Sequence, residues 1–249
     1  MQRMSSSSNL HRQRGISLYI VIVLVMLSML LALWGSRTSI FNEMIVGNDA
    51  DYQRAIEAAQ ALIQDAEFDI KGTRPDGSSC VPGATADTCR PPSAATTVWF
   101  PNEDKDLANL FTTLNQAATS QYCIKGICLK RTGYQDFWND KATLTAMIAA
   151  DVGARYGQFT GAETGGSATK ASNPILKNQT AGQGGWYWIE VMPYDGNAGN
   201  SGLITNGSTN LALNLMPNVA YRITAIARGI KPNTQVVLQS TFVRQKMKN

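Results

Sequence analysis

Four cysteines are the residues of this chain best suited to chemistry. The 249-residue sequence places them at Cys80, Cys89, Cys123 and Cys128. Eight residues separate the first two and four the last two, which fits zinc ligation poorly, and the one histidine, His11, lies far from all of them. An even cysteine count is typical of disulfide bonds made in an oxidising compartment. Three pairings are open, and we expect the one with the shortest loops, Cys80 with Cys89 and Cys123 with Cys128.

Known catalytic signatures do not occur in the sequence, which has no G-x-S-x-G elbow, phosphate-binding loop or H-E-x-x-H helix. Ser167 and Lys170 match an S-x-x-K pattern, but the surrounding Gly/Thr-rich segment offers no apolar setting to activate a serine–lysine pair. We therefore expect a protein that is not an enzyme and has no cofactor.

Two polar stretches hold side chains that calcium could use. One contains Asp104 and Asp106, and the other contains Asp195, Asn197 and Asn200. Neither follows the spacing of a calcium-binding loop, so we expect solvated turns and no metal.

The charge distribution gives no sign of a nucleic-acid binder. The chain has 22 basic and 18 acidic residues, but Arg3, Arg12 and Arg14 lie in the first fourteen positions, where there is no acid. Beyond them the charges nearly balance, without the clustered Lys/Arg surface that nucleic acids require.

A hydrophobic run follows this basic segment. The twenty residues from Ile16 to Gly35 contain no charge and no proline. As a helix rising 1.5 Å per residue they would span roughly 30 Å, the thickness of the hydrocarbon core of a bilayer. Since the arginines are concentrated before the run, we expect the N-terminus in the cytoplasm and the rest of the chain in the periplasm. A cleaved secretory signal is disfavoured because Leu33 and Trp34, which are not small, follow Ala32.

The junction Arg14, Gly15, Ile16 resembles that of type IV prepilins, whose basic leader is cut after a glycine. The segment from Arg37 to Glu67, with its Glu-Met, Gly-Asn and Ala-Ala-Gln-Ala-Leu elements, resembles the opening of PilX-type minor pilins. The ending YRITAIARG and TQVVLQSTFVR is similar to the terminal hairpin of the same family. Residues 72–185 are recognised only as a variable insertion.

The resemblance implies processing and partners. A prepilin peptidase would cut after Gly15, and Ile16 would become a methylated N-terminus. The subunit would wait in the inner membrane and then join the pilus at its tip, with other minor pilins, the major pilin and a PilY-type tip adhesin as partners, supporting twitching motility.

One residue departs from the pattern of most type IV pilins. Their fifth residue after the cleavage site is glutamate, whereas here it is Ile20. The departure favours a subunit that primes assembly at or near the tip rather than one that extends the filament. Glu43, just beyond the apolar run, is either an assembly contact or a solvated helix charge.

The helix continues past the membrane run. Apolar residues recur at spacings of three and four over Ile56, Ala59, Ile63, Ala66 and Ile70, which predicts an amphipathic helix ending near Gly72. The polar residues Glu57, Gln60, Gln64 and Asp65 fall largely off this face. Gly35 and Gly47 are the expected bend points, because glycine destabilises a helix by about 1 kcal/mol.

The rest of the chain predicts a small sheet with insertions. We expect a loop over 72–104, helices over 106–121 and 137–156, and a long mobile loop over 157–185. Strands are predicted at 186–194, 219–228 and 234–244, the last two as a hairpin. Tyr221, Ile223, Ala225 and Ala227 share one face, which should pack on the helix.

Together these patterns predict an α+β, type IV pilin-like fold: a long N-terminal helix packed on a small antiparallel sheet. The expected divisions are a leader (1–15), a transmembrane half-helix (16–36), an amphipathic half-helix (37–71) and a globular domain (72–249). Two alternatives stay open. One is a K-type minor pseudopilin of type II secretion, and the other is a signal-anchored periplasmic binding domain.

Overall fold

A computed structural model describes residues 16–82, 88–90, 98–116, 121–165, 172–194 and 215–245. The chain forms two compact units, divided between Asp49 and Ala50. Each unit is described by itself below.

The long helix α1 runs from Ile16 to Lys71. It passes through Gly35 and Gly47, the expected bend points, without an interruption of the helix at either. The helix ends where predicted, because Gly72 adopts the left-handed conformation (φ 67°) that favours glycine. Within the described residues, α1 is the one helix long and apolar enough to cross a membrane, and its most apolar stretch has a mean hydropathy of 2.9.

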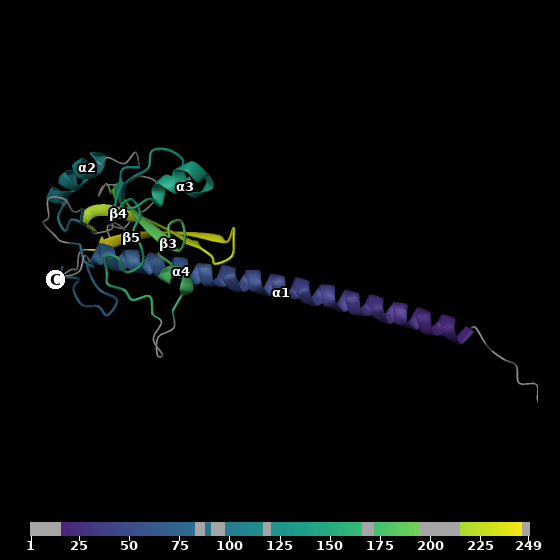
Figure 1. Cartoon of the computed structure of the whole chain (residues 1–249). Helices are drawn as coiled ribbons and strands as arrows, with labels where there is room; N and C mark the ends of the chain where they lie inside the picture. Colours follow the sequence, from purple (N-terminus) through teal and green to yellow (C-terminus); the bar gives the residue numbers. More distant parts are fainter. Residues whose placement is uncertain are drawn as a thin grey trace, which may run out of the picture. The chain divides into compact units, whose positions relative to one another are not determined.

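The second unit contains a five-stranded sheet in the order β1-β2-β3-β4-β5 (Figure 1). Its strands are β1 (Cys123–Ile124), β2 (Ile127–Leu129), β3 (Gly185–Pro193), β4 (Leu215–Arg228) and β5 (Gln235–Gln245). All neighbours are antiparallel except β2 and β3, which are parallel. The α+β class is thus confirmed, and the three predicted strands, β3, β4 and β5, are antiparallel as expected. The two short strands were not predicted, and one of them, β2, joins the sheet in parallel. The two short strands are too brief for alternation to reveal them, and a tight turn at Gly126 (φ 85°) connects them.

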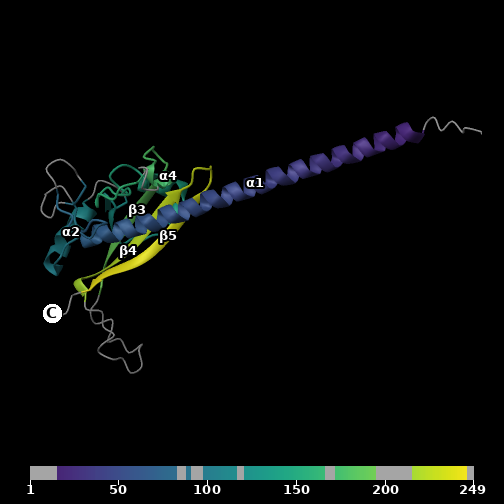
Figure 2. The ribbon, with the colours of Figure 1, turned by 90° about the horizontal axis from the view of Figure 1, so that it is seen from below.

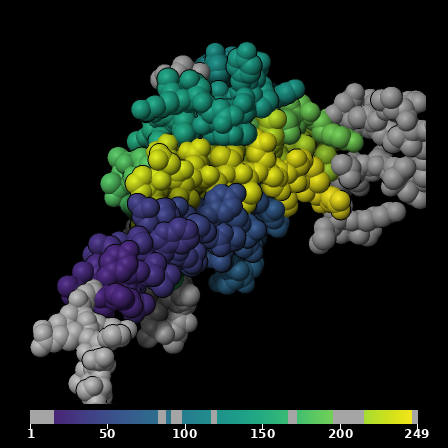
Figure 3. All heavy atoms as spheres, turned by 90° about the vertical axis from the view of Figure 1, so that its right-hand side faces the viewer, coloured from purple at the N-terminus to yellow at the C-terminus, as the bar shows by residue number. Residues whose placement is uncertain are grey.

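Strand β3 is buried on both faces. Tyr187, Ile189 and Val191 belong to the large core that includes α1, whereas Trp186 and Trp188 belong to a second core on the other face. Figures 1 and 3 show the sheet lying between the α1 residues of this unit and the segment around α3. In Figure 2, seen from below, the same part of α1 lies across β3, β4 and β5. The sheet is therefore the middle of three layers.

The hairpin of β4 and β5 follows the prediction. Tyr221, Ile223, Ala225 and Ala227 are all fully buried in the core shared with α1. The helix approaches the sheet closely, since a Cβ added to Gly185 on β3 would lie 2.6 Å from the side chain of Leu62 on α1.

The short helices differ from their predicted bounds. They are a 3₁₀ turn η1 (Asp104–Asp106), α2 (Leu107–Asn115), a 3₁₀ turn η2 (Phe137–Asn139), α3 (Lys141–Met147) and α4 (Pro174–Lys177). The predicted helix over 137–156 was too long, because α3 ends at Met147 and Val152 enters the second core from a turn. Asp140 begins α3 by accepting a hydrogen bond from the Thr143 amide (2.7 Å).

The long loop expected over 157–185 was also wrong in part. Residues 157–165 form turns that carry buried Phe159 and Thr160, and α4 buries Ile175 and Leu176. The many small residues of this stretch gave no apolar pattern to detect, but a few large buried side chains are enough to hold its described parts in place.

Candidate functional site

The apolar stem, defined as residues 16–49 of α1, exposes every side chain from Ile16 to Val46. Ile20 is 49% exposed within it, and Glu43 is exposed as well. Gly15, the predicted cleavage residue, lies outside the described residues. So large an exposed apolar surface is stable only against lipid or other protein chains.

The part of α1 in the second unit carries three buried carboxylates. Asp51, Asp65 and Asp69 are each at most 5% exposed. They are spaced by nearly whole helical turns, which places them on one side of the helix. The sequence analysis missed Asp51 and Asp69 and wrongly placed Asp65 off the buried face. The signal that could have found them is that they stand at helical spacing from the alanines that face the sheet, and therefore on the same side of the helix.

The buried stripe is rotated from the predicted one. Ile56 and Ile63 are only partly buried. The fully buried residues of the stripe are small for the most part: Ala55, Ala58, Ala59, Leu62, Ala66 and Ile70. The small alanine side chains let the helix pack closely against β3 and β4, which is why the helix face that meets the sheet is the alanine face rather than the one with Ile56 and Ile63.

Asp51 holds the turn between β4 and β5. Its carboxylate oxygens accept hydrogen bonds from the backbone amides of Ile230 (2.9 Å) and Lys231 (3.0 Å). Burial acts to raise the pKa of Asp51, but the amides of Ile230 and Lys231 outweigh it and hold the pKa below its usual value. Gly229 is required here, because a Cβ would lie 2.3 Å from the Asp51 carboxylate.

Asp65 holds the turn at 157–160. It accepts hydrogen bonds from the Gly157 amide (2.7 Å) and from the Thr160 hydroxyl. Burial raises the pKa of Asp65 to about 6, although both hydrogen bonds oppose the change. This carboxyl therefore titrates well above its ordinary range.

Asp69 forms a buried ion pair with Arg90. Its oxygens accept from Arg90 Nε (2.7 Å) and from a terminal nitrogen of Arg90 (2.8 Å), and also from the Tyr187 hydroxyl (2.9 Å). Burial and the neighbouring Asp69 carboxylate raise the pKa of the Tyr187 phenol, so it stays a hydrogen-bond donor. Arg90 belongs to the loop expected over 72–104, where its burial was not predicted: its side chain is only 5% exposed.

Both disulfides have the pairing that the sequence analysis favoured. One joins Cys80 to Cys89, and the other joins Cys123 to Cys128 across the β1–β2 hairpin. The first closes a segment next to the end of α1, and the second stabilises the shortest strands of the sheet.

Of the remaining polar candidates, Asp104 and Asp106 are among the described residues, and they do not form a ligand-binding arrangement. Asp104 accepts hydrogen bonds from both the backbone and the side-chain amide of Asn218 (2.6 and 2.8 Å), whereas Asp106 begins α2. The described ranges contain no cluster of three metal-ligating side chains. Ser167, Lys170, Asp195, Asn197 and Asn200 all lie outside the residues that the structure describes.

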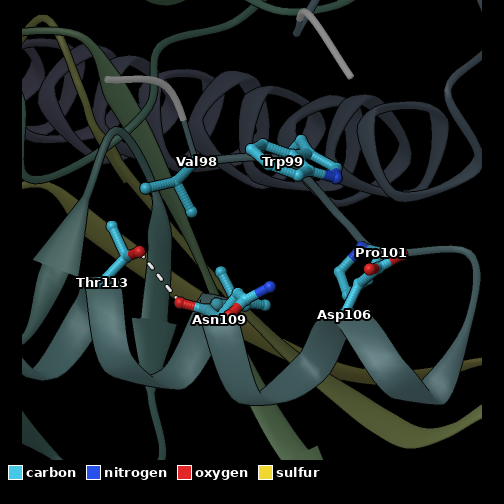
Figure 4. Close-up of a pocket in the computed structure, with 7 residues that line it drawn as sticks. Val98, Trp99, Pro101, Asp106, Asn109 and Thr113 are labelled. Atoms are coloured by element: carbon cyan, nitrogen blue, oxygen red, sulfur yellow. Dashed lines mark hydrogen bonds between the residues drawn. The ribbon is translucent and has the colours of Figure 1, made fainter. Parts of the chain in front are cut away.

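A hollow beside α2 is too small for a ligand. Its walls are formed by Val98, Trp99, Pro101, Asp106, Asn109, Leu110 and Thr113 (Figure 4). The cavity measures about 40 Å³, whereas sites for small molecules occupy roughly 300–1,000 Å³. The Thr113 hydroxyl, on its wall, already donates a hydrogen bond to the backbone carbonyl of Asn109 (2.9 Å).

Comparison with protein families gives one match. A model described as "Type IV pilus assembly protein PilX C-term" matches residues 84–244, more than half of the chain. Neither the curated proteins nor the solved structures include a match. The match covers nearly all of the sheet and the described segments between residues 98 and 165. The apolar helix that precedes it fits a prepilin-like anchor. On these grounds the chain belongs to the PilX family of type IV pilus assembly proteins.

Proposed function

We propose that this chain is a structural minor pilin that primes assembly of the pilus at or near its tip. The observation that carries the proposal is the stem, whose uncharged residues are exposed along its whole described length. A helix of this kind must exchange lipid for other helices as a filament forms. The role needs no catalysis and no cofactor.

Ile20 supports the position at the tip. Resemblance to type IV pilins implies a glutamate there, which would need a partner because an ionised carboxylate in an apolar setting is costly. The side chain of Ile20 needs no such partner. A subunit without that requirement is suited to start a filament, with its own N-terminus receiving the glutamate of the next subunit.

Processing follows from the same resemblance. A prepilin peptidase cuts after Gly15, and Ile16 becomes the methylated N-terminus. The stem anchors the subunit in the inner membrane with its globular domain in the periplasm. The partners are then the major pilin, other minor pilins and a PilY-type tip adhesin, with Glu43 as a candidate contact just beyond the membrane.

The test begins with the N-terminus of the native protein. Mass spectrometry should find N-methyl-isoleucine from Ile16, whereas a chain that still carries Met1 would contradict the proposal. Immunogold labelling of sheared pili should then place the subunit at filament ends. Labelling along the whole length would exclude the tip position.

Substitution of Ile20 tests the reason for that position. Ile20→Glu should move a measurable share of the subunit away from the ends, while Ile20→Val, the matched control, should not. Unchanged confinement of Ile20→Glu to the tips would show that this side chain does not set the location. A deletion strain that loses surface pili and twitching but keeps exoprotein release would exclude the type II pseudopilin alternative.

A further inference from the structure

We infer that the Cys80–Cys89 disulfide is a latch that delivers Arg90 to Asp69, so that the core is completed only in the oxidised chain. The inference concerns the second unit alone and does not depend on the proposed function. It joins three features found together at the end of α1: a tight hairpin, a disulfide and a buried ion pair.

The hairpin fixes Cys80 next to α1. Just after the helix, the Thr73 amide donates to the Phe68 carbonyl (3.0 Å), and the Cys80 amide donates to the Gly72 carbonyl (2.9 Å). Thr73 and Ser79 also pair as an antiparallel bridge. The first sulfur of the disulfide is therefore held at the helix terminus by local structure.

The disulfide then carries that restraint to Arg90. Cys89 is 2% exposed and immediately precedes Arg90 in the sequence. With the bond formed, a single peptide link separates Arg90 from a sulfur anchored at the helix end. Without the bond, Arg90 is connected to Cys80 only through the intervening loop.

Arg90 connects several segments. Besides its ion pair with Asp69, it donates to the carbonyls of Lys125 (2.7 Å) and Val98 (3.4 Å). Its guanidinium also lies 3.6 Å from the centre of the Phe159 ring. Lys125 lies inside the loop closed by Cys123 and Cys128, so Arg90 ties the second disulfide to the helix as well.

Two physical terms make the latch strong. A buried carboxylate that loses its cation is left uncompensated in the core, which is among the costliest defects in a folded protein. Without the disulfide, the contact must be made across about ten residues of chain, which lowers its probability by up to about 30-fold, since the entropy cost of closure grows with the logarithm of the chain length. Disulfide formation removes two electrons and two protons from the thiols, which a disulfide-bonded protein oxidant accepts as it becomes a dithiol.

A double-mutant cycle on the full-length chain in detergent tests the latch. Cys80→Ala/Cys89→Ala removes the disulfide, and Asp69→Asn/Arg90→Met removes the ion pair without leaving a lone charge. Urea unfolding is followed through the fluorescence of buried Trp186 and Trp188. We expect disulfide loss to raise the unfolding equilibrium constant about tenfold more with the ion pair present than without it.

A second ion pair supplies the control. Arg222 and Glu190 form a contact of 2.6 Å between β4 and β3, away from the latch. Glu190→Gln/Arg222→Met should therefore combine additively with loss of the disulfide. Equal disulfide effects in the presence and absence of Asp69 and Arg90 would overturn the inference.

A measurement on folded protein covers the case in which the disulfide-free chain does not fold. By thermodynamic reciprocity, the ion pair should also protect the disulfide. Asp69→Asn/Arg90→Met should thus release the Cys80 and Cys89 thiols at about one tenth of the dithiothreitol that the native chain requires, read by alkylation and mass spectrometry. An unchanged dithiothreitol requirement would refute the latch.

Discussion

The two parts of α1 differ in how much of their surface is buried within the chain. The stem has an uncharged run from Ile16 to Gly35 and exposes its side chains throughout, whereas residues 51–70 lie against the sheet and bury three carboxylates. One continuous helix thus carries a run without any acid, Ile16 to Gly35, and a segment whose three buried acids all accept hydrogen bonds.

The two parts also differ in where their contacts come from. Asp51, Asp65 and Asp69 receive their hydrogen bonds from loops of the same chain, so this part of the helix is complete in the monomer. The apolar run from Ile16 to Gly35 has no charged side chain that would need such partners. Its apolar surface is left for a bilayer or a filament, which agrees with membership of a pilus assembly family.

The largest expected effect comes from adding charge to the stem. Leu24→Arg/Leu27→Arg should oppose membrane insertion by about 6 kcal/mol, because each arginine near the centre of a spanning helix costs roughly 3 kcal/mol. Carbonate extraction of membranes should find the protein released, whereas Leu24→Ile/Leu27→Ile should stay in the pellet. Retention of the arginine variant in the membrane would remove the distinction between the two parts of the helix.

An intermediate effect is expected from the titration of Asp65. Its folded pKa of about 6 exceeds the unfolded value, so the folded chain holds a proton that the unfolded chain releases. The groups around it are Asp69, Arg90, Tyr156 and Tyr187. Stability should therefore fall by at most about 3 kcal/mol as pH rises from about 4 to about 6. Urea unfolding across this window measures the slope.

Asp65→Asn is the control for that titration. Its amide can still accept from the Gly157 backbone and donate to the Thr160 hydroxyl, but it cannot ionise. The variant should lose the slope between pH 4 and 6, and it should be no less stable than the native chain at pH 7. An identical slope in the variant would assign the titration to another group.

The smallest effect is expected at the β4–β5 turn. Asp51→Ala removes the charge-assisted hydrogen bonds from the Ile230 and Lys231 amides and from the Thr234 side chain. Water can reach the freed amides of the exposed turn, so we expect a loss of about 2 kcal/mol. Asp51→Asn keeps one acceptor and should lose less. Hydrogen exchange at Ile230 and Lys231 should accelerate more than exchange in the strand interior. Equal acceleration throughout β4 would show that Asp51 supports the whole sheet rather than the turn.

Predictions from the sequence succeeded where neighbours along the chain decide the outcome. The end of α1 at Gly72 follows from the conformation of glycine, and the β4–β5 hairpin follows from alternation on both sides of a turn. They failed for β1 and β2: β1 pairs only with β2, and β2 pairs with β3 more than fifty positions away. A strand of two or three residues has no periodicity to detect.

The sequence by itself determined the stem, the two disulfide loops and the terminal hairpin, because each depends on residues close together in the chain. Only the tertiary structure decided which polar groups lie in the core. The partners of Asp51 and Asp65 are 179 and 92 positions distant, and Arg90 reaches Asp69 from 21 positions away. An aspartate on a helix is a solvated charge until a remote loop supplies its donors, and no local pattern specifies which loop that is.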